Sequence, residues 1–127
     1  MSYIAKNPEA YAGKVVGEDP YKGQCAVFVQ VAAGAPLTTL WTQGALVKGN
    51  YALAAGTAIA TFGADGKYTN RGDGTAHGAI YVSQDSQGIW VWNQWVGSNG
   101  VCKNCIYYRH GAAVPHVADG DYYYVIE

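Results

Sequence analysis

The 127 residues are enough for one domain with one hydrophobic core, and we expect a single domain over residues 1–127. Half of the residues are hydrophobic and 13% are charged, which argues for a globular chain and against disorder. The net charge of −1 gives no electrostatic footprint for nucleic acid or an anionic membrane, so neither is expected as a partner. We also expect no signal peptide and no membrane insertion, because no basic segment followed by an apolar one opens the sequence and no apolar run approaches roughly 20 residues.

The first third of the chain predicts helices. Residues 8–12 indicate a short helical entry, and the aspartate-proline pair at 19–20 is a plausible helix start, because aspartate caps helices and proline is preorganised at the first position. The apolar segment 25–33 would suit a strand through its valines, but its alanines favour a helix. Gly34 and Pro36 form a conventional helix stop. We therefore predict a helix over 25–33 that is buried on nearly all sides.

The rest of the chain predicts strands after a mixed stretch at 37–55. The β-prone segments are separated by short turns. They cover residues 57–62, 77–82, 89–96, 105–109 and 122–126. A helix-rich third followed by consecutive strands predicts an α+β fold with an antiparallel sheet.

One cysteine, Cys25, begins the helix predicted over 25–33 and follows Gly23 and Gln24. At a helix N-terminus, unsatisfied backbone N–H groups and the positive end of the helix dipole favour the thiolate, which is the nucleophilic form. The same N–H groups can bind the oxyanion that forms when the sulfur attacks a carbonyl. A buried structural cysteine is the more common role for a free thiol, and this stretch alone leaves that alternative open.

A cysteine nucleophile needs an imidazole that accepts its proton and later donates it to the leaving amine. His77 opens a strand directly after a polar loop, from which its side chain can project toward a helix packed on the sheet, whereas His110 and His116 flank a Gly/Ala/Pro loop and look solvated. The next strand offers Asn93 and Gln94 as the third, orienting group. The choice between the two stays open, because a slip of one residue exchanges the faces of a strand.

Three tryptophans lie in the predicted strand 89–96. Trp90 and Trp92 share one face of this strand and are expected to pack in the core. Trp95 lies on the other face and is a candidate wall of a substrate groove.

Two further short motifs have structural interpretations. Cys102 and Cys105 form a C-x-x-C on an expected turn, where two cysteines cannot complete a four-ligand zinc site and no helix follows as in a thioredoxin motif. We therefore predict a local disulfide in an oxidising compartment and no metal site. The tripeptide at 71–73, Arg-Gly-Asp, also occurs in cell-adhesion ligands but is interpreted as a polar turn before the strand at 77–82.

Taken together, these motifs resemble the papain-like cell-wall amidases, which include the CHAP and NlpC-type endopeptidases. The resemblance rests on a Gly-Gln-Cys helix start, on a strand opening with His-Gly-Ala-Ile-Tyr, and on a polar residue in the next strand. Within this superfamily the sequence is most similar to the small type VI secretion amidase effectors. The segments that carry this second similarity are residues 23–25, 35–38 with Trp41, 56–62 and 124–127.

The resemblance implies an NlpC-type fold, in which N-terminal helices, including the nucleophile helix, pack on a C-terminal antiparallel sheet or half-barrel. It implies hydrolysis of an amide bond in the peptide stem of peptidoglycan, without metal or cofactor. Cys25 would be the nucleophile, His77 the general base and then acid, and Asn93 the orienting group. The backbone N–H of Cys25 would contribute to the oxyanion hole. The residues expected to contact the substrate are Gln24, Gln94 and Trp95.

A cell-wall amidase without a signal peptide fits an antibacterial effector that an injection apparatus delivers into the periplasm of a competing bacterium. The producing cell then needs an immunity protein that occludes the groove, and we expect the enzyme to be a monomer. A phage lysin exported through a holin is a close variant. The alternative from another functional class is a non-catalytic cell-wall or carbohydrate-binding module, in which Cys25 would be buried and inert.

Overall fold

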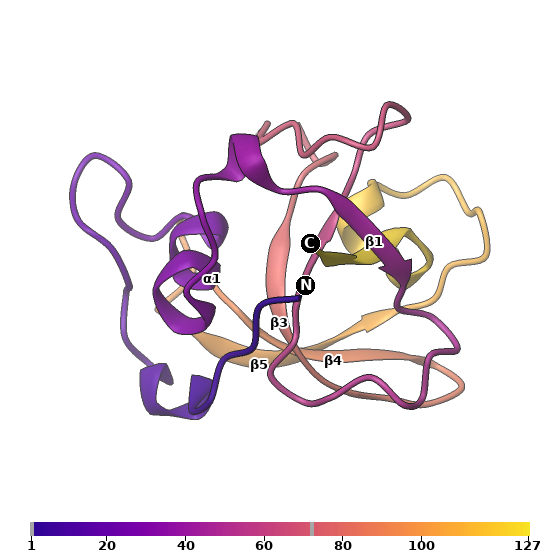
Figure 1. The fold of residues 1–127 in the computed structure, drawn as a ribbon, viewed down its shortest axis with the longest axis horizontal. Helices are drawn as coiled ribbons and strands as arrows, with labels where there is room; N and C mark the ends of the chain where they lie inside the picture. The colour runs from indigo at the N-terminus through magenta and orange to yellow at the C-terminus, as the bar shows by residue number, and fades with distance from the viewer. Residues whose placement is uncertain (1, 72) are drawn as a thin grey trace.

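A single α-helix packs beside a six-stranded antiparallel sheet in the computed structural model, which describes residues 2–71 and 73–127 (Figure 1). The helix is α1 (Cys25–Ala33) and the strands are β1 (Gln43–Leu46), β2 (Ala58–Thr61), β3 (Gly78–Gln84), β4 (Gly88–Asn93), β5 (Cys102–Tyr107) and β6 (Tyr123–Ile126). Short 3-10 turns are η1 (Pro8–Tyr11), η2 (Thr38–Leu40), η3 (His116–Ala118) and η4 (Gly120–Tyr122). The strand order is β1-β6-β2-β3-β4-β5, and every pair is antiparallel, so the predicted α+β class is confirmed.

Helix α1 begins and ends at the predicted residues 25 and 33. Gly34 closes it in the left-handed region at φ 69° and donates its N–H to the Gln30 carbonyl, as a C-terminal glycine is expected to do. The separate expectation of a helix start at residues 19–20 is wrong, because the chain there makes turns that continue to Gln24. Helix α1 is also not buried on nearly all sides, since Val31 is 52% exposed on the side turned away from the sheet.

Two hydrophobic clusters cover the two faces of the sheet, because neighbouring residues of a strand point to opposite faces. In β2, Ala58 and Ala60 belong to the cluster that packs under α1, and Ile59 belongs to the other. The cluster under α1 also contains Phe28 and Val29 of the helix. Helix α1 is therefore fixed against one face, with its N-terminus near the start of β3.

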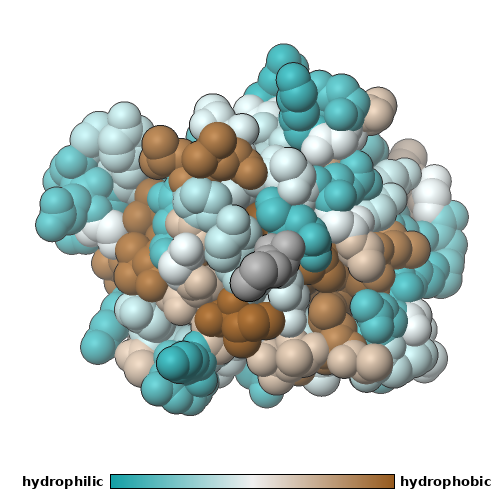
Figure 2. Space-filling view, viewed as in Figure 1, coloured by the Kyte–Doolittle hydropathy of each residue, from teal (hydrophilic) through white to brown (hydrophobic). Residues whose placement is uncertain are grey.

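Strand β1 is the one strand of the described chain that the sequence did not predict. It pairs with β6, about 80 residues further along the chain, and Gly44 makes this close approach possible. A Cβ atom at Gly44 would lie 2.8 Å from the Val125 carbonyl oxygen. Near this edge, the space-filling view shows hydrophobic residues gathered over the region of η2, where Leu37 and Leu40 are exposed (Figure 2).

The expectation that Trp90 packs in the core is wrong. Its ring is exposed, and the ammonium group of Lys103 lies 5.9 Å above it. Trp92 is half-buried against the cluster under α1. The buried residues of this strand are instead Ile89 and Val91, which alternate with the tryptophans and face the other cluster.

The predicted disulfide between Cys102 and Cys105 is also wrong, as both thiols are free. Both residues lie inside strand β5 and not on a turn. Residues three apart in a strand are separated by about 10 Å and point to opposite faces. A disulfide needs Cα atoms about 4.4–6.8 Å apart, so this geometry excludes the bond.

Three expectations concern features outside the core. The tripeptide at 71–73, interpreted as a polar turn, includes residue 72, which lies outside the described residues. Over residues 2–71 and 73–127, no cluster of three or more His, Cys, Asp or Glu side chains could hold a metal ion. In the same part of the chain, no helix is long and apolar enough to cross a membrane.

Candidate active site

The N-terminus of α1 places Cys25 in the wall of a pocket of about 760 Å³. The helix is preceded by Gln24 in an extended conformation, which makes no side-chain cap to the helix. The first helical hydrogen bond described in α1 runs from the Phe28 N–H to the Gln24 carbonyl. The N–H groups of the first turn are therefore left for a ligand near the sulfur, as helix geometry requires.

His77 reaches the same pocket from the start of β3. Its backbone is held by Thr61 at the end of β2: the His77 N–H donates to the Thr61 hydroxyl oxygen at 3.0 Å, and the Thr61 N–H donates to the His77 carbonyl at 3.0 Å. The Thr61 hydroxyl in turn donates to the Thr75 carbonyl at 3.0 Å. A buried threonine thus fixes the point at which the loop enters β3, and with it the position of the imidazole.

Asn93, at the end of β4, is the polar residue that meets the ring of His77. Its amide nitrogen lies 3.0 Å from Nε2 of His77, and its side chain is buried. The amide oxygen faces the thiol of Cys102 at 3.8 Å, across the pair that Asn93 and Cys102 form between β4 and β5. Because Nε2 is in contact with Asn93, the other ring nitrogen is left to interact with Cys25.

The surroundings of Cys25 favour its thiolate. Burial by itself would raise the pKa of the thiol, but a hydrogen bond and the charge of His77 oppose this effect, and hydrogen bonds from the Gly78 backbone and the Tyr68 hydroxyl add to them. The pKa falls from 9.0 to about 7 as a result. At neutral pH a substantial fraction of the sulfur is therefore in its nucleophilic form.

Tyr68 is a member of this site that the sequence did not single out. Its hydroxyl oxygen lies 3.7 Å from the Cys25 sulfur, and its ring packs against Trp41 with centroids 4.6 Å apart. Burial raises the pKa of Tyr68 strongly, and the nearby Cys25 raises it further. The hydroxyl therefore stays protonated and can donate to the thiolate. Tyr68 lies in a polar loop without a recognisable pattern, so its contact with Cys25 could not be predicted from the sequence.

Gln94 does not bind substrate as predicted, because its side chain is fully buried and is hydrogen-bonded to the backbone. Its amide oxygen accepts from the Val16 N–H at 2.9 Å, and its amide nitrogen donates to the Val16 carbonyl at 3.0 Å and to the Gln24 carbonyl at 2.9 Å. Gln94 therefore ties the segment before Cys25 to the end of β4. Of the two amides, it is Asn93 that lies beside His77.

The other two residues predicted to contact substrate, Gln24 and Trp95, both line the pocket. Trp95 is 46% exposed, so one side of its ring is free to form a wall. Cys25, His77, Asn93, Gln24 and Trp95 thus converge on one cavity although they come from three separate parts of the chain.

A helix that presents a cysteine to a histidine at the start of a strand of an antiparallel sheet is the arrangement of a papain-like cysteine hydrolase. The domesticated amidase effector 2 family model matches residues 1–126 of the chain. The chain belongs to this family of amidases.

Two curated relatives and one solved structure support the same assignment. The type VI secretion amidase effector 2 protein of Salmonella typhi is 35% identical over 122 residues, which cover 91% of this chain and 89% of the relative. The domesticated amidase effector 2 of Ixodes scapularis is 35% identical over 127 residues, which cover 95% and 82%. The structure of type 6 secretion amidase effector 2 superposes with a TM-score of 0.84 at 31% identity and covers 98% of this chain and 94% of that one. These similarities confirm the predicted family and fold.

Proposed function

We propose that this amidase hydrolyses an amide bond in the peptide stem of peptidoglycan, with Cys25 as nucleophile, His77 as general base and acid, and Asn93 as the group that orients the imidazole. The observation that carries the proposal is the contact of the Cys25 thiol, the His77 ring and the Asn93 amide in the wall of one open pocket. A thiolate paired with an imidazole is the arrangement that acyl transfer to sulfur requires.

The proposed reaction begins when His77 accepts the proton of Cys25 and the thiolate attacks the amide carbonyl. The oxyanion that forms lies at the N-terminus of α1, where the N–H groups of the first turn can donate to it. His77 then gives its proton to the leaving amine, and a thioester on Cys25 remains. Water, activated by His77, hydrolyses the thioester and restores the thiol.

Asn93 has a specific part in this sequence. When His77 carries both ring protons, its Nε2–H needs an acceptor, and the Asn93 amide supplies one if its oxygen turns to the ring. An amide stabilises this orientation without adding a negative charge. Cys102, which touches the other side of the same amide, does not obstruct the turn, because a thiol can donate or accept a weak hydrogen bond.

We also propose that the protein is a secreted effector acting in the periplasm of a target bacterium as a single-domain monomer. The names of the Salmonella relative and of the solved structure, both type VI secretion effectors, support delivery by a secretion apparatus. The match of the family model to residues 1–126 supports one amidase domain. An immunity protein that covers the pocket would protect the producing cell, because the pocket is open in the free enzyme.

A non-catalytic wall-binding module has less support. That alternative requires a buried and inert Cys25, whereas the thiol is partly exposed, lines the pocket and has a lowered pKa.

The test is digestion of purified peptidoglycan by the wild type and by Cys25→Ala, followed by mass spectrometry of the soluble fragments. We expect the wild type to release stem-peptide fragments with one water added per bond cut. Cys25→Ala should release none, while its circular dichroism spectrum remains that of the wild type. Equal digestion by a folded Cys25→Ala would contradict the mechanism, and no digestion by the wild type would contradict the substrate.

A further inference from the structure

The charged side chains that line the active-site pocket are both arginines, while the carboxylates of Asp73 and Asp85 lie nearby but outside its lining. Arg71 and Arg109 line the pocket together with Cys25, and no aspartate or glutamate is among the described residues that line it. The chain as a whole carries a net charge of −1, so this local excess of positive charge is a property of the pocket and not of the composition. A cleft lined by one sign of charge concentrates ligands of the opposite sign.

Arg109 is held in place by its backbone. It follows the end of β5 by two residues, and its N–H donates to the Asp119 carboxylate at 2.9 Å. That buried carboxylate also accepts from the Asp121 N–H at 2.9 Å. The backbone at the start of the loop after β5 is therefore fixed by the Asp119 carboxylate, although the side chain of Arg109 is exposed.

The guanidinium of Arg109 is positioned but not neutralised. Its Nε donates to the Ala118 carbonyl at 3.4 Å, and the group lies 5.5 Å from the centroid of the Tyr107 ring. No carboxylate forms an ion pair with it among the described residues. Nε uses one of the five N–H donors, so the four on the terminal nitrogens remain for a ligand. A guanidinium presents these donors in a fork that matches a carboxylate.

Arg71 approaches the same wall from the loop before β3. The Val117 N–H donates to the Gly74 carbonyl at 3.2 Å, which joins this loop to the loop after β5. A Cβ atom at Gly74 would lie 3.1 Å from Pro115, so the two loops are in close contact. The two arginines thus come from loops that meet at one end of the pocket.

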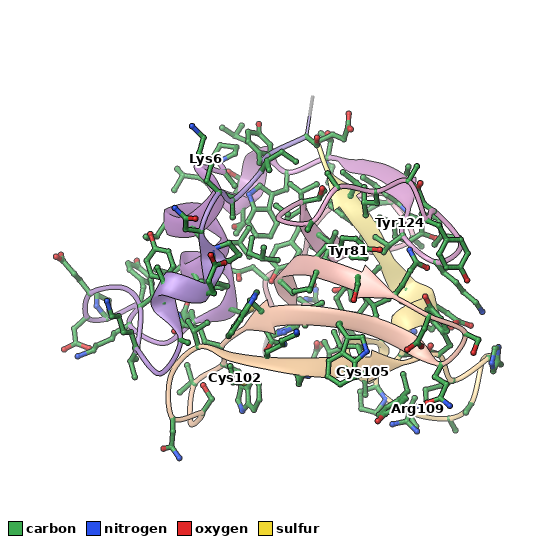
Figure 3. The ribbon with its side chains drawn as sticks, turned by 90° about the horizontal axis from the view of Figure 1, so that it is seen from below. Lys6, Tyr81, Cys102, Cys105, Arg109 and Tyr124 are labelled. Atoms are coloured by element: carbon green, nitrogen blue, oxygen red, sulfur yellow. The ribbon has the colours of Figure 1, made fainter. Side chains whose placement is uncertain are left out.

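Strand β5 runs from the Asn93 side of the pocket toward Arg109, because Cys102 at its start pairs with Asn93 and Arg109 follows its last residue by two positions. Figure 3 shows Cys102 at one end of this strand, Cys105 within it and Arg109 beyond the other end. Cys102 is paired with Asn93, and the four residue-to-residue steps from Cys102 to Ile106 span about 13 Å in a strand. An extended peptide with its scissile amide at Cys25 would need several residues to reach Arg109.

We propose that Arg109, with Arg71, forms a carboxylate-binding subsite that selects peptides carrying a free carboxylate several residues away from the scissile amide. The inference rests on the proposed function and specifies its substrate further: stem peptides with free carboxylates are good substrates, and stem peptides whose carboxylates are amidated are poor ones.

The test compares two soluble stem-peptide fragments, one with free carboxylates and one with the same carboxylates converted to carboxamides. For the wild type at low salt we expect kcat/KM to be about 10-fold higher for the free carboxylates, as for the loss of one charge-assisted hydrogen-bonded pair. Arg109→Gln should remove this preference by slowing only the carboxylate substrate. Arg109→Lys should keep part of it, because an ammonium retains the charge without the fork.

Lys103→Gln is the matched control, since it removes one positive charge from β5 at a residue whose side chain lies over Trp90 and does not line the pocket. It should keep the full preference. Equal cleavage of both fragments by the wild type, or an unchanged preference in Arg109→Gln, would overturn the subsite alone. Failure of the wild type to cleave either fragment would overturn the proposed function and the subsite together.

Discussion

Two cysteines border the same pocket, and their pKa values are shifted in opposite directions from that of an ordinary thiol. The pKa of Cys25 is lowered to about 7, whereas burial raises the pKa of Cys105 and the nearby carboxylate of Asp85 raises it further. Burial acts in the same direction on both thiols. The difference comes from their neighbours, because Cys25 faces an imidazole and Cys105 faces a negative charge. Reactivity in this pocket therefore depends on what the fold places beside a sulfur and not on how exposed the sulfur is.

The largest effect should come from removing the imidazole, which would make Cys25 resemble Cys105. We expect His77→Ala to lower amidase activity by about 10³-fold or more, because nucleophile and base act as a unit. The double variant Cys25→Ala/His77→Ala should be no worse than Cys25→Ala alone. Rates of fragment release measured by mass spectrometry test this.

Cys105→Ala is the matched control for that experiment, and we expect it to lose less than about threefold. A His77→Ala variant that keeps most of its activity, or a Cys105→Ala variant that loses most of it, would contradict the distinction between the two cysteines.

A smaller effect should separate the two neighbouring amides, Asn93 at the end of β4 and Gln94 directly after it. Asn93→Ala should lower turnover by about 10²-fold, because an imidazole that is no longer oriented transfers protons less efficiently. Gln94→Ala should act mainly on stability, since it leaves buried backbone groups of Val16 and Gln24 without partners. We expect it to cost about 1–3 kcal/mol in the free energy of unfolding.

Turnover and thermal melting of both variants provide the measurement. If Gln94→Ala lost turnover without a change in melting and Asn93→Ala lost neither, the roles of the two amides would be reversed.

The parts of the fold that follow from local pattern were predictable. The helix over 25–33 is marked by its apolar residues and by Gly34, and β-branched and aromatic runs marked five of the six strands. Strand β1 was missed because its pairing with β6 depends on a contact across the chain and on the missing side chain of Gly44.

The errors arose where the answer depends on strand register or on tertiary contacts. The face of β4 that packs in the core depends on strand register, so the exposure of Trp90 could not be predicted. The bounds of β5 depend on its pairing with β4, so the position of Cys102 and Cys105 inside a strand could not be predicted either. Tyr68 could not be predicted because it reaches Cys25 from a loop without a recognisable pattern. Cys25 and His77 could be proposed from sequence because each stands at the start of a recognisable element, which is where a side chain can project into a cleft. Asn93 could be proposed, together with Gln94, because it is a polar residue in an otherwise apolar predicted strand.

The most direct measurement is the pH dependence of alkylation by iodoacetamide at each cysteine of the native protein, with the sites assigned by peptide mass mapping. The thiolate is the form that reacts, so the rate follows the ionised fraction and rises with pH through the pKa. We predict a half-maximal rate near pH 7 at Cys25, with about a tenth of the maximum at pH 6. At Cys105 the rate should rise only above the range of an ordinary thiol. A Cys25 that is alkylated only at the same high pH as Cys105 would contradict the assignment of Cys25 as the activated nucleophile.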